Sequence, residues 1–566
     1  MASVREPSSP VGSPPPPKRA KLDVSHEPLE APEEIRHEEH KVKIKSKKSR
    51  PKRPNIEPYS HEDVLWHDVK DVLGSHIVDT ATTQDKDWES PLSFGTVLEL
   101  TVSGLTSTGD SISVHSTSER SWAVIVPFAL PGEKIRTKIY RSSRLHSFGD
   151  LLEVLEPNTT MRDSSLIRCK YFGDCAGCQH QMIPYATQLA LKEEIVRKAF
   201  RNFSGLPNAS VPAPLATMPS PQQYNYRTKI TPHFDAPPSN RTRRGRRTKI
   251  PKRRILAGSS ESGLTRWAGG MCWTLRTVQS QPQFLMPPLA QHESKSAGNN
   301  IHTYKRGATL LLRDSFEPRS PPGGEDAAKA QNERISIAKC KDDQGIEHVC
   351  ITDSKAVVHE RVGEFEFTFP AGQFFQNNNS VLKCLTDYVR DAILHPIPSE
   401  NGDIGQPPTH LVDTYCGSGL FSITLSPHFE VIAGIEISAD SIAFAQQNAH
   451  LNNISASKCT FRVGTASSIF ASVGNGEFPP ERTAVVIDPP RKGCDEPFIE
   501  QLVAFRPATL VYVSCNVHTQ ARDIGSILRK TQDAGEGHQY HIESIRGFDL
   551  FPQTAHVESV AVLRLY

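Results

Sequence analysis

Long apolar runs are missing from this sequence of 566 residues. No stretch approaches the ~20 apolar residues that a membrane-spanning helix needs, so no membrane span is predicted. Cysteine is also scarce, at 11 residues, and no secretory signal pattern opens the chain. Few cysteines without such a signal favour a reducing, intracellular compartment over a disulfide framework.

An excess of one charge is missing as well. Lys and Arg number 65 against 63 Asp and Glu, which gives a formal net charge of +2. Affinity for a polyanion must therefore come from local patches. The run Lys41–Arg53 carries eight basic residues in thirteen and no acid. We interpret it as a nuclear-import signal or an RNA-binding arm, with a solvated tail as the alternative. Tyr224–Lys229 mixes aromatic and basic residues and indicates either a stacking surface or an amphipathic strand.

Shifts in composition divide the chain. The first 88 residues are rich in Pro, Ser, Glu and Lys and poor in aromatics, which predicts disorder. Short alternating runs separated by turns follow and predict a small β-barrel, with a generic all-β domain as the alternative. The predicted division is a disordered basic region at 1–88, a barrel at 89–158, a cysteine-bearing segment at 159–215, a central α+β region at 216–363 and an α/β domain with a doubly wound sheet at 364–566.

The last domain contains a strand, a glycine turn and a helix, which together are typical of a cofactor-binding site. His410–Thr414 is an apolar run, Gly417 and Gly419 follow it, and a helix is expected from Leu420. Glycines there let the backbone approach a ligand next to a helix N-terminus. A second strand ends in Glu436, which is placed to bind a ribose hydroxyl pair. The third glycine of a dinucleotide fingerprint is missing, which favours a nucleoside without a pyrophosphate, such as S-adenosylmethionine.

Cys515 follows another apolar run, Leu510–Val513, and precedes Asn516. The run is typical of a buried parallel strand. Because ligands bind beyond the carboxyl ends of strands in open α/β sheets, a thiol at this place can act as a nucleophile. The alternative is a buried structural cysteine, which is the more common fate of a lone thiol.

Two acids complete the candidate site. Asp488 ends a third apolar run and is followed by two prolines, which on its own indicates only a strand-ending turn. Glu558 precedes the last alternating run, Ser559–Tyr566. A carboxylate at that junction can serve as a general base, although such a residue alone is more often a solvated strand end.

Five stretches occur together and in order: Gln373–Asn378, Asp413–Gly419, Asp488–Arg491, Ser514–Asn516 and Phe551–Glu558. This combination resembles the RNA (uracil-5-)-methyltransferase family, and most closely its fungal tRNA members. The resemblance extends from Ser93 to Tyr566. It implies a class I, S-adenosylmethionine-dependent enzyme whose barrel is the OB-like TRAM type.

The resemblance also implies roles for single residues. Cys515 would be the nucleophile and Glu558 the base, and the cofactor would be held by Gln376, Tyr415, Glu436 and Asp488. The expected reaction is methylation of C5 of a uridine in RNA, with the T-loop uridine of tRNA as the expected target. We expect a monomer with RNA as its partner. Methylation of ribosomal RNA and an RNA-binding chaperone with little turnover are the alternatives.

The reaction explains the need for a thiol. Addition of a thiolate at C6 of uracil places negative charge on C5, so that C5 can attack a methyl donor. A base then removes the C5 proton and the thiol is expelled. A free thiol is mostly protonated near neutral pH, so the pocket must lower its pKa or deprotonate it during the attack. The target base must also leave its stack.

Three further cysteines have the spacing of metal ligands. Cys169, Cys175 and Cys178 lie within ten residues. This spacing suits a [4Fe–4S] cluster, which normally takes four Cys ligands, and zinc is the alternative. Members of the family that carry a cluster use a later cysteine as fourth ligand, in a segment of the form Asp-Ile-x-x-Cys-Pro-Ile.

That later segment is absent where it is expected, within residues 253–300. The codons for Met271–Thr274 can also be read in a shifted frame, in which the third base of each codon joins the first two bases of the next. In that frame they can only encode Val-Leu-Asp. The same frame permits Ile-Glu-Asp-Cys-Pro-Ile over Thr274–Ser280 and Ile-Gly-Phe over Glu261–Leu264. We therefore predict that 253–300 is an aberrant insertion, translated out of frame or mis-spliced. Cys272 would then be no true ligand, and the cluster would lack its fourth thiolate.

Overall fold

The computed structural model describes residues 56–118, 120–174, 177–231, 233–234, 266–267, 270–271, 308–309, 311–316, 335–341, 345–397, 406–464, 470, 476–533 and 539–566. The chain divides into two units, Met1–Asn55 and Ile56–Tyr566. The basic run 41–53 belongs to the first unit, which lies outside the described residues. All statements below concern the second unit.

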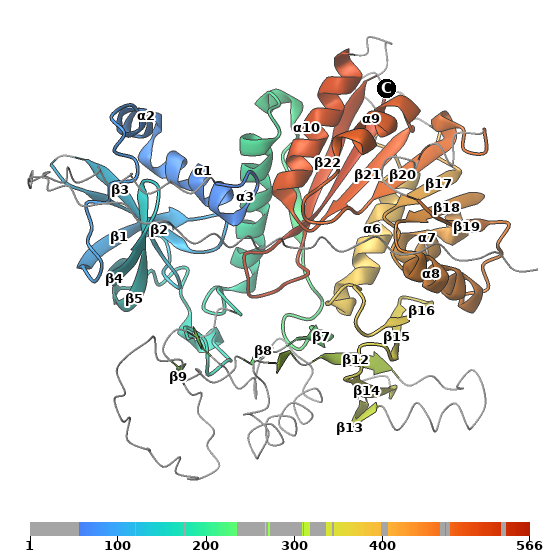
Figure 1. The fold of residues 1–566 in the computed structure, drawn as a ribbon, viewed down its shortest axis with the longest axis horizontal. Coiled ribbons are helices and arrows are strands. Elements are labelled where there is room, and N and C mark those ends of the chain that lie inside the picture. Colours follow the sequence, from blue (N-terminus) through green and yellow to red (C-terminus); the bar gives the residue numbers. More distant parts are fainter. Residues whose placement is uncertain are drawn as a thin grey trace, which may run out of the picture. The chain divides into compact units, whose positions relative to one another are not determined.

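Five strands close into a barrel near the start of this unit (Figure 1). They are β1 (Val97–Leu105), β2 (Ser111–Ser116), β3 (Ser121–Val126), β4 (Lys134–Ser142) and β5 (His146–Glu156), in the order β1-β2-β3-β5-β4. The pairing of β3 with β5 is parallel, and the other pairings are antiparallel. Trp122, Val124 and Ile135 are fully buried inside it. The predicted β-barrel is confirmed.

Two helices precede the barrel, α1 (His61–Leu73) and α2 (Ser75–Thr83). The prediction of disorder over 1–88 is therefore wrong for residues 56–88. Leu65 and Val69 are buried in the same apolar cluster as the barrel interior, because α1 covers that core with one apolar face. The local signal is a cap: Ser60 Oγ accepts the N–H of Asp63 at 3.2 Å, and the Asp63 carboxylate accepts the N–H of Tyr59 at 2.7 Å.

An eight-stranded sheet forms the second half of the unit (Figure 1). Its order is β19-β18-β17-β20-β21-β23-β22-β6, and β23 is antiparallel to both neighbours while the other pairs are parallel. The strands are β6 (Leu215–Met218), β17 (His410–Thr414), β18 (Val431–Glu436), β19 (Cys459–Val463), β20 (Thr483–Ile487), β21 (Thr509–Ser514), β22 (Tyr540–Phe548) and β23 (Glu558–Leu565).

Helices cover both faces of this sheet, because successive strand residues point to opposite faces. Leu411 and Val486 pack in one apolar cluster, and their neighbours Val412 and Val485 pack in another. The first cluster includes residues of α6 (Leu382–Leu394), α7 (Leu420–Thr424) and α8 (Ala439–Leu451), and the second includes residues of α3 (Tyr185–Phe203), α9 (Glu496–Phe505) and α10 (Val517–Asp533). The predicted α/β class with a barrel and a doubly wound sheet is confirmed.

Smaller strands lie between the two large elements. A four-stranded sheet has the order β13-β14-β12-β7, and β15 pairs with β16. Their bounds are β7 (Lys229–Ile230), β12 (Leu312–Phe316), β13 (Ile335–Lys341), β14 (Glu347–Ile351), β15 (Val357–Val362) and β16 (Phe365–Pro370). Two-residue pairs are β8 (His233–Phe234) with β11 (Ala308–Thr309) and β9 (Arg266–Trp267) with β10 (Gly270–Met271). Apart from β9 and β10, the predicted insertion 253–300 falls outside the described residues.

Within the described residues, the remaining regular elements are short 3-10 helices: η1 (Ser164–Leu166), η2 (Asn208–Ser210), η6 (Asn379–Val381), η7 (Ser426–His428) and η10 (Pro480–Arg482). In the part of the chain that the structure describes, no helix combines the length and apolar character needed to cross a bilayer.

Candidate active site

Three adjacent strands bring the predicted nucleophile and two acids together. Cys515 follows β21 and Asp488 follows β20, so both lie at the carboxyl edge of the sheet. Glu558 begins β23, and because this strand runs antiparallel, its first residue lies at the same edge. The pairing of Ser514 with Ser559 fixes this register. The antiparallel last strand is therefore what carries Glu558 to Cys515.

The surroundings of Cys515 favour the protonated form of its thiol. Burial raises the pKa of the thiol to about 12, and the charges of Glu558 and Asp488 act in the same direction. The Arg491 guanidinium opposes them through its charge and a hydrogen bond to the sulfur. Burial, followed by the charges of Glu558 and Asp413, raises the pKa of Asp488 well above its usual range. Of the two routes open to the thiol, this arrangement favours deprotonation during the attack over a preformed thiolate.

The loop before Glu558 is held by a buried cation that the sequence analysis did not identify. Lys192 of α3 has no exposed side-chain surface. Its ammonium group contacts the Asp549 carboxylate and donates to the carbonyls of Phe551 at 3.0 Å and His556 at 2.8 Å. The hydroxyl of Tyr185 donates to Asp549 at 2.8 Å. These bonds fix both ends of the loop that leads to the predicted base.

A pair of glutamines, Gln188 and Gln553, adds to the contacts by which Lys192 and Tyr185 hold this loop. Gln188 donates to the side chain of Gln553 at 3.0 Å and accepts the N–H of Gln553 at 3.1 Å. A signal for the anchor exists in the sequence, because Tyr185, Gln188 and Lys192 follow the i, i+3, i+7 spacing of one helix face. Such a polar stripe ordinarily indicates the solvent-facing side of a helix, so its burial could not be read from the spacing alone.

The glycine turn after β17 has open space above Gly417 and two carboxylates nearby. Gly417 has φ +55°, and a Cβ added there would meet no atom within 4 Å. Glu436 accepts the N–H of Gly417 at 3.3 Å and that of Ser438 at 3.0 Å. One oxygen of Asp413 is buried without a hydrogen-bond partner, and burial raises the pKa of this carboxyl to about 7. Open space over a glycine turn, with carboxylates beside it, fits a nucleoside cofactor.

The four predicted cofactor residues are not equally connected. Tyr415 has φ 62° and directly follows β17, Glu436 ends β18, and Asp488 directly follows β20. Because β18, β17 and β20 are adjacent and parallel, these three residues lie at one edge of the sheet. Gln376 is buried at 8% exposure, but the described contacts do not link it to that group.

Two of the three metal-type cysteines are described. Burial, and with it the charges of Cys178 and Cys169, raise the pKa of Tyr224, so both sulfurs lie near that phenol. Cys175 falls outside the described residues. Among the residues that are described, no group of three His, Cys, Asp or Glu side chains could hold a metal ion. The cluster therefore stays a prediction.

The aromatic–basic stretch 224–229 is structural at its centre. Tyr226 is buried at 3% exposure, and its hydroxyl donates to the carbonyl of Pro552 at 3.2 Å. Arg168 lies over the Tyr224 ring, with its guanidinium carbon 4.4 Å from the ring centroid. Tyr226 is thus not available to stack on a base, and it supports the same loop that Lys192 holds.

Comparison with known proteins agrees with this geometry. Residues 348–565 match the family model of tRNA (Uracil-5-)-methyltransferase. The tRNA (uracil(54)-C(5))-methyltransferase of Schizosaccharomyces pombe is 43% identical over 466 residues, which are 82% of this chain and 78% of that protein. The enzyme of the same name from Saccharomyces cerevisiae is 38% identical over 482 residues, with 81% and 72% covered.

A solved structure shows the same fold. It is the Pyrococcus abyssi tRNA (uracil-54, C5)-methyltransferase in complex with S-adenosyl-L-homocysteine, at a TM-score of 0.50 and 18% identity. The match covers 82% of this chain and 100% of that one. With the motifs, the strand order and relatives at this level of identity, the chain belongs to the tRNA (uracil-5-)-methyltransferase family.

Proposed function

We propose that this protein transfers a methyl group from S-adenosylmethionine to C5 of uridine 54 in tRNA, the position that the names of its two fungal relatives give. The observation that carries the proposal is the convergence of Cys515, Asp488 and Glu558 at three adjacent strand ends beside the glycine turn. A nucleophilic thiol and a carboxylate base at one sheet edge are the groups that methylation at C5 of uracil requires.

The residues that would hold the cofactor are Glu436, Tyr415, Asp488 and Gln376. When bound, S-adenosylmethionine supplies an electrophilic methyl group. Glu436 is placed to accept hydrogen bonds from the ribose hydroxyls, since it stands at the carboxyl end of β18 next to the Gly417 N–H. Asp413 supports these residues. Its Oδ2 accepts hydrogen bonds from the N–H and the hydroxyl of Ser422, which fixes the first turn of α7.

The protein groups act in sequence on the uracil ring. The thiol proton of Cys515 passes to solvent water in the open cavity as the sulfur forms a bond to C6, and the C5–C6 π electrons move onto C5 and O4. Arg491 stabilises the developing thiolate by charge and hydrogen bonding. After C5 is methylated, Glu558 takes the C5 proton. The C5–C6 double bond then re-forms, the C6–sulfur bond breaks and Cys515 leaves.

The proposal extends to the cysteine-bearing segment. Cys169, Cys175 and Cys178 would be three ligands of a [4Fe–4S] cluster whose fourth thiolate is expected to be missing from this chain, with zinc as the alternative metal. The proximity of Cys169 and Cys178 to Tyr224 supports a shared site. Iron, sulfide and zinc analysis of protein purified without oxygen tests it. Less than one metal equivalent per chain would contradict the cluster in this chain.

Two further parts of the proposal concern the whole chain in solution. We propose a monomer whose basic run 41–53 directs it to the nucleus or binds RNA. Light scattering tests the first part. A Lys-to-Gln change of the whole run, followed by localisation and tRNA binding, tests the second, and unchanged results in both assays would assign the run to a solvated tail.

The direct experiment is methyl transfer from labelled S-adenosylmethionine to a tRNA transcript, with nucleoside analysis for 5-methyluridine. A transcript with cytidine at position 54 is the matched control, and we expect no label in it. Equal labelling of both transcripts would move the target to another uridine. Label in ribosomal RNA alone would replace the tRNA assignment, and label in neither RNA would leave only an RNA-binding role.

A further inference from the structure

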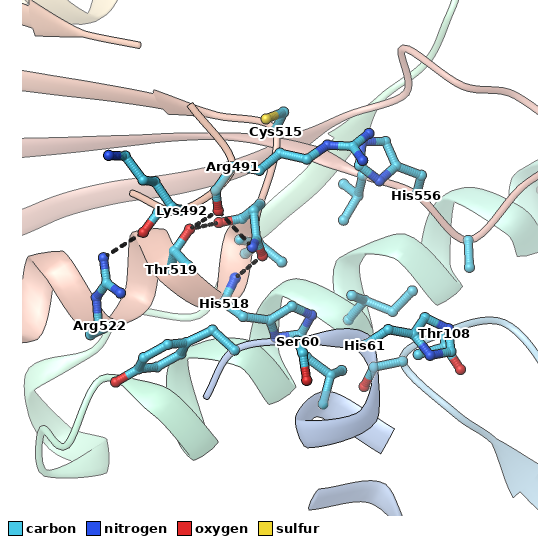
Figure 2. Close-up of a pocket in the computed structure, with 18 of the residues that line it drawn as sticks. Ser60, His61, Thr108, Arg491, Lys492, Cys515, His518, Thr519, Arg522 and His556 are labelled. Carbon is cyan, nitrogen blue, oxygen red and sulfur yellow. Dashed lines mark hydrogen bonds between the residues drawn. The ribbon is translucent and has the colours of Figure 1, made fainter. Parts of the chain in front are cut away.

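A cavity of about 650 Å³ opens beside the thiol of Cys515. Figure 2 shows Cys515 on one side and Ser60, His61 and Thr108 on the other. Its walls come from the start of α1, the loop between β1 and β2, α3 and the loop before it, the loops that follow β20 and β21, and the loop before β23. The volume falls within the about 300–1,000 Å³ typical of ligand sites. A uracil ring at Cys515 would occupy only one end of it.

The charge of the cavity wall is positive. Arg491 and Lys492 line it with exposed side chains, and neither forms a salt bridge to a carboxylate in the part of the chain that is described. Glu57 is the single acid among its described lining residues. The first turn of α10 also lines it and carries no acidic residue, and its His518 N–H already donates to Asn516 at 3.2 Å. Such a wall is suited to an anion.

An unpartnered buried group faces the same space. His518, in the first turn of α10, lines the cavity, and its Nδ1 is buried without a hydrogen-bond partner. Burial, with smaller contributions from His67 and His556, lowers the pKa of this imidazole to about 4, so it is neutral near pH 7. A neutral imidazole offers one donor or acceptor to a polar ligand without repelling its charge.

Helix α1 is a fixed part of this wall. The carboxylate of Asp68 accepts the N–H of Ser107 at 2.7 Å and the ammonium group of Lys198 at 2.9 Å, which ties α1 to the barrel loop and to α3. On the opposite side, Arg522 lies 4.7 Å from the centroid of the Tyr59 ring and donates to the carbonyl of Lys492 at 2.9 Å. The cavity is therefore formed before any ligand enters.

We propose that this cavity is a second nucleotide subsite, which holds the nucleotide joined by a phosphodiester to the target uridine. Its phosphate binds Lys492 and the first turn of α10, and its sugar and base lie against the exposed His61 at the start of α1. The inference rests on the proposed function, because a uridine presented to Cys515 within RNA carries its neighbours and their phosphates with it. Packing of a base against the His61 ring and phosphate contact with Lys492 are modes in which single-stranded RNA is bound.

The test compares Lys492→Gln and His61→Glu in the full chain with two matched controls outside the cavity, Lys86→Gln and His76→Glu. Each protein is titrated with a stem-loop RNA that contains the target uridine, at several salt concentrations. We expect Lys492→Gln to weaken binding roughly three- to tenfold and to reduce the slope of log Kd against log salt by about 0.7 to 1. His61→Glu should weaken binding at least as much, and both controls should match the wild type.

A second RNA, with a neutral methylphosphonate in place of the phosphate next to the target, identifies the contact. The wild type should bind it more weakly, whereas Lys492→Gln should lose no further affinity. Equal binding by all four variants, or a phosphonate penalty that persists in Lys492→Gln, overturns the subsite. Methyl transfer is measured in parallel, and its absence in the wild type would overturn the proposed function while the binding data still decide the subsite.

Discussion

Cys515 is the proposed nucleophile, and its surroundings favour the protonated form of the thiol. We expect Cys515→Ala to abolish methyl transfer and to leave S-adenosylmethionine affinity within about twofold, because the proposed contact of the thiol is with the target base and not with S-adenosylmethionine. RNA with 5-fluorouridine at the target should trap a covalent complex with the wild type, since fluorine cannot leave as a proton. Gel analysis of the complex checks this, and residual activity of the Ala variant would contradict covalent catalysis.

The pKa of this thiol has a direct readout at the same residue. A group whose pKa is raised to about 12 gains thiolate roughly tenfold per pH unit across neutrality. Alkylation of Cys515 by iodoacetamide should therefore rise without a plateau from pH 7 to pH 10. Arg491→Gln should slow it, because the guanidinium is what opposes the raised pKa. Half-maximal reactivity near pH 8.5, with a plateau above it, would mean an ordinary thiol, and mass spectrometry of the labelled peptide assigns the site.

Glu558 can be separated from Cys515 by the species that accumulates. If Glu558 removes only the C5 proton, Glu558→Gln should still add to the ring but release product slowly. A covalent RNA–protein complex should then build up with ordinary uridine, and denaturing gels would detect it. Asp488→Asn provides a comparison at the neighbouring carboxyl. An inactive Glu558→Gln variant without any adduct would assign this residue to structure or substrate binding.

At the scale of elements, the loop 549–557 depends on a charge from α3. Lys192→Met would leave Asp549 buried without its cation, and breaking such a pair costs about 3–5 kcal/mol. Urea unfolding should show this loss, and the double variant Lys192→Met with Asp549→Leu should recover part of it. The single variant should also lower kcat, because the loop positions Glu558. Stability equal to the wild type would mean that the pair contributes nothing net.

Sequence patterns predict the elements that carry their own signal. The strand that ends at Glu436 and the thiol at the end of β21 follow from local alternation and turn residues, and both lie where they were expected. Helix α1 was missed because its six apolar residues lie within a segment that is polar as a whole, although Ser60 marks its start. Lys192 was missed because a lysine on a helix reads as exposed unless its distant partner is known. Contacts between remote segments, as at Asp68 and Ser107, have no local signal.

At the scale of the whole molecule, the segment 253–300 is where the sequence departs from the pattern of its family. If it is translated out of frame, the genomic DNA or transcript should encode Asp-Ile-x-x-Cys-Pro-Ile in the shifted frame. A chain with that frame restored should bind iron through Cys169, Cys175, Cys178 and the new cysteine. Sequencing of the transcript and iron analysis of both chains check this. A transcript that lacks the motif in every frame would make the insertion a genuine part of the protein.

The bridge from Asp68 to Ser107 and Lys198 sets a limit on how this enzyme can be recombined. A chimaera that exchanges the barrel alone would sever the carboxylate from the loop it holds, and Asp68 would remain buried beside Lys198 with an unsatisfied oxygen. The smallest stretch that keeps this bridge intact is therefore Ile56 to Phe203, which holds α1, the barrel and α3, and its host must supply a carboxylate in the place of Asp549 for the buried Lys192. A graft with those borders would carry one wall of the cavity into a new host, whereas a graft that begins at the first strand would leave it behind.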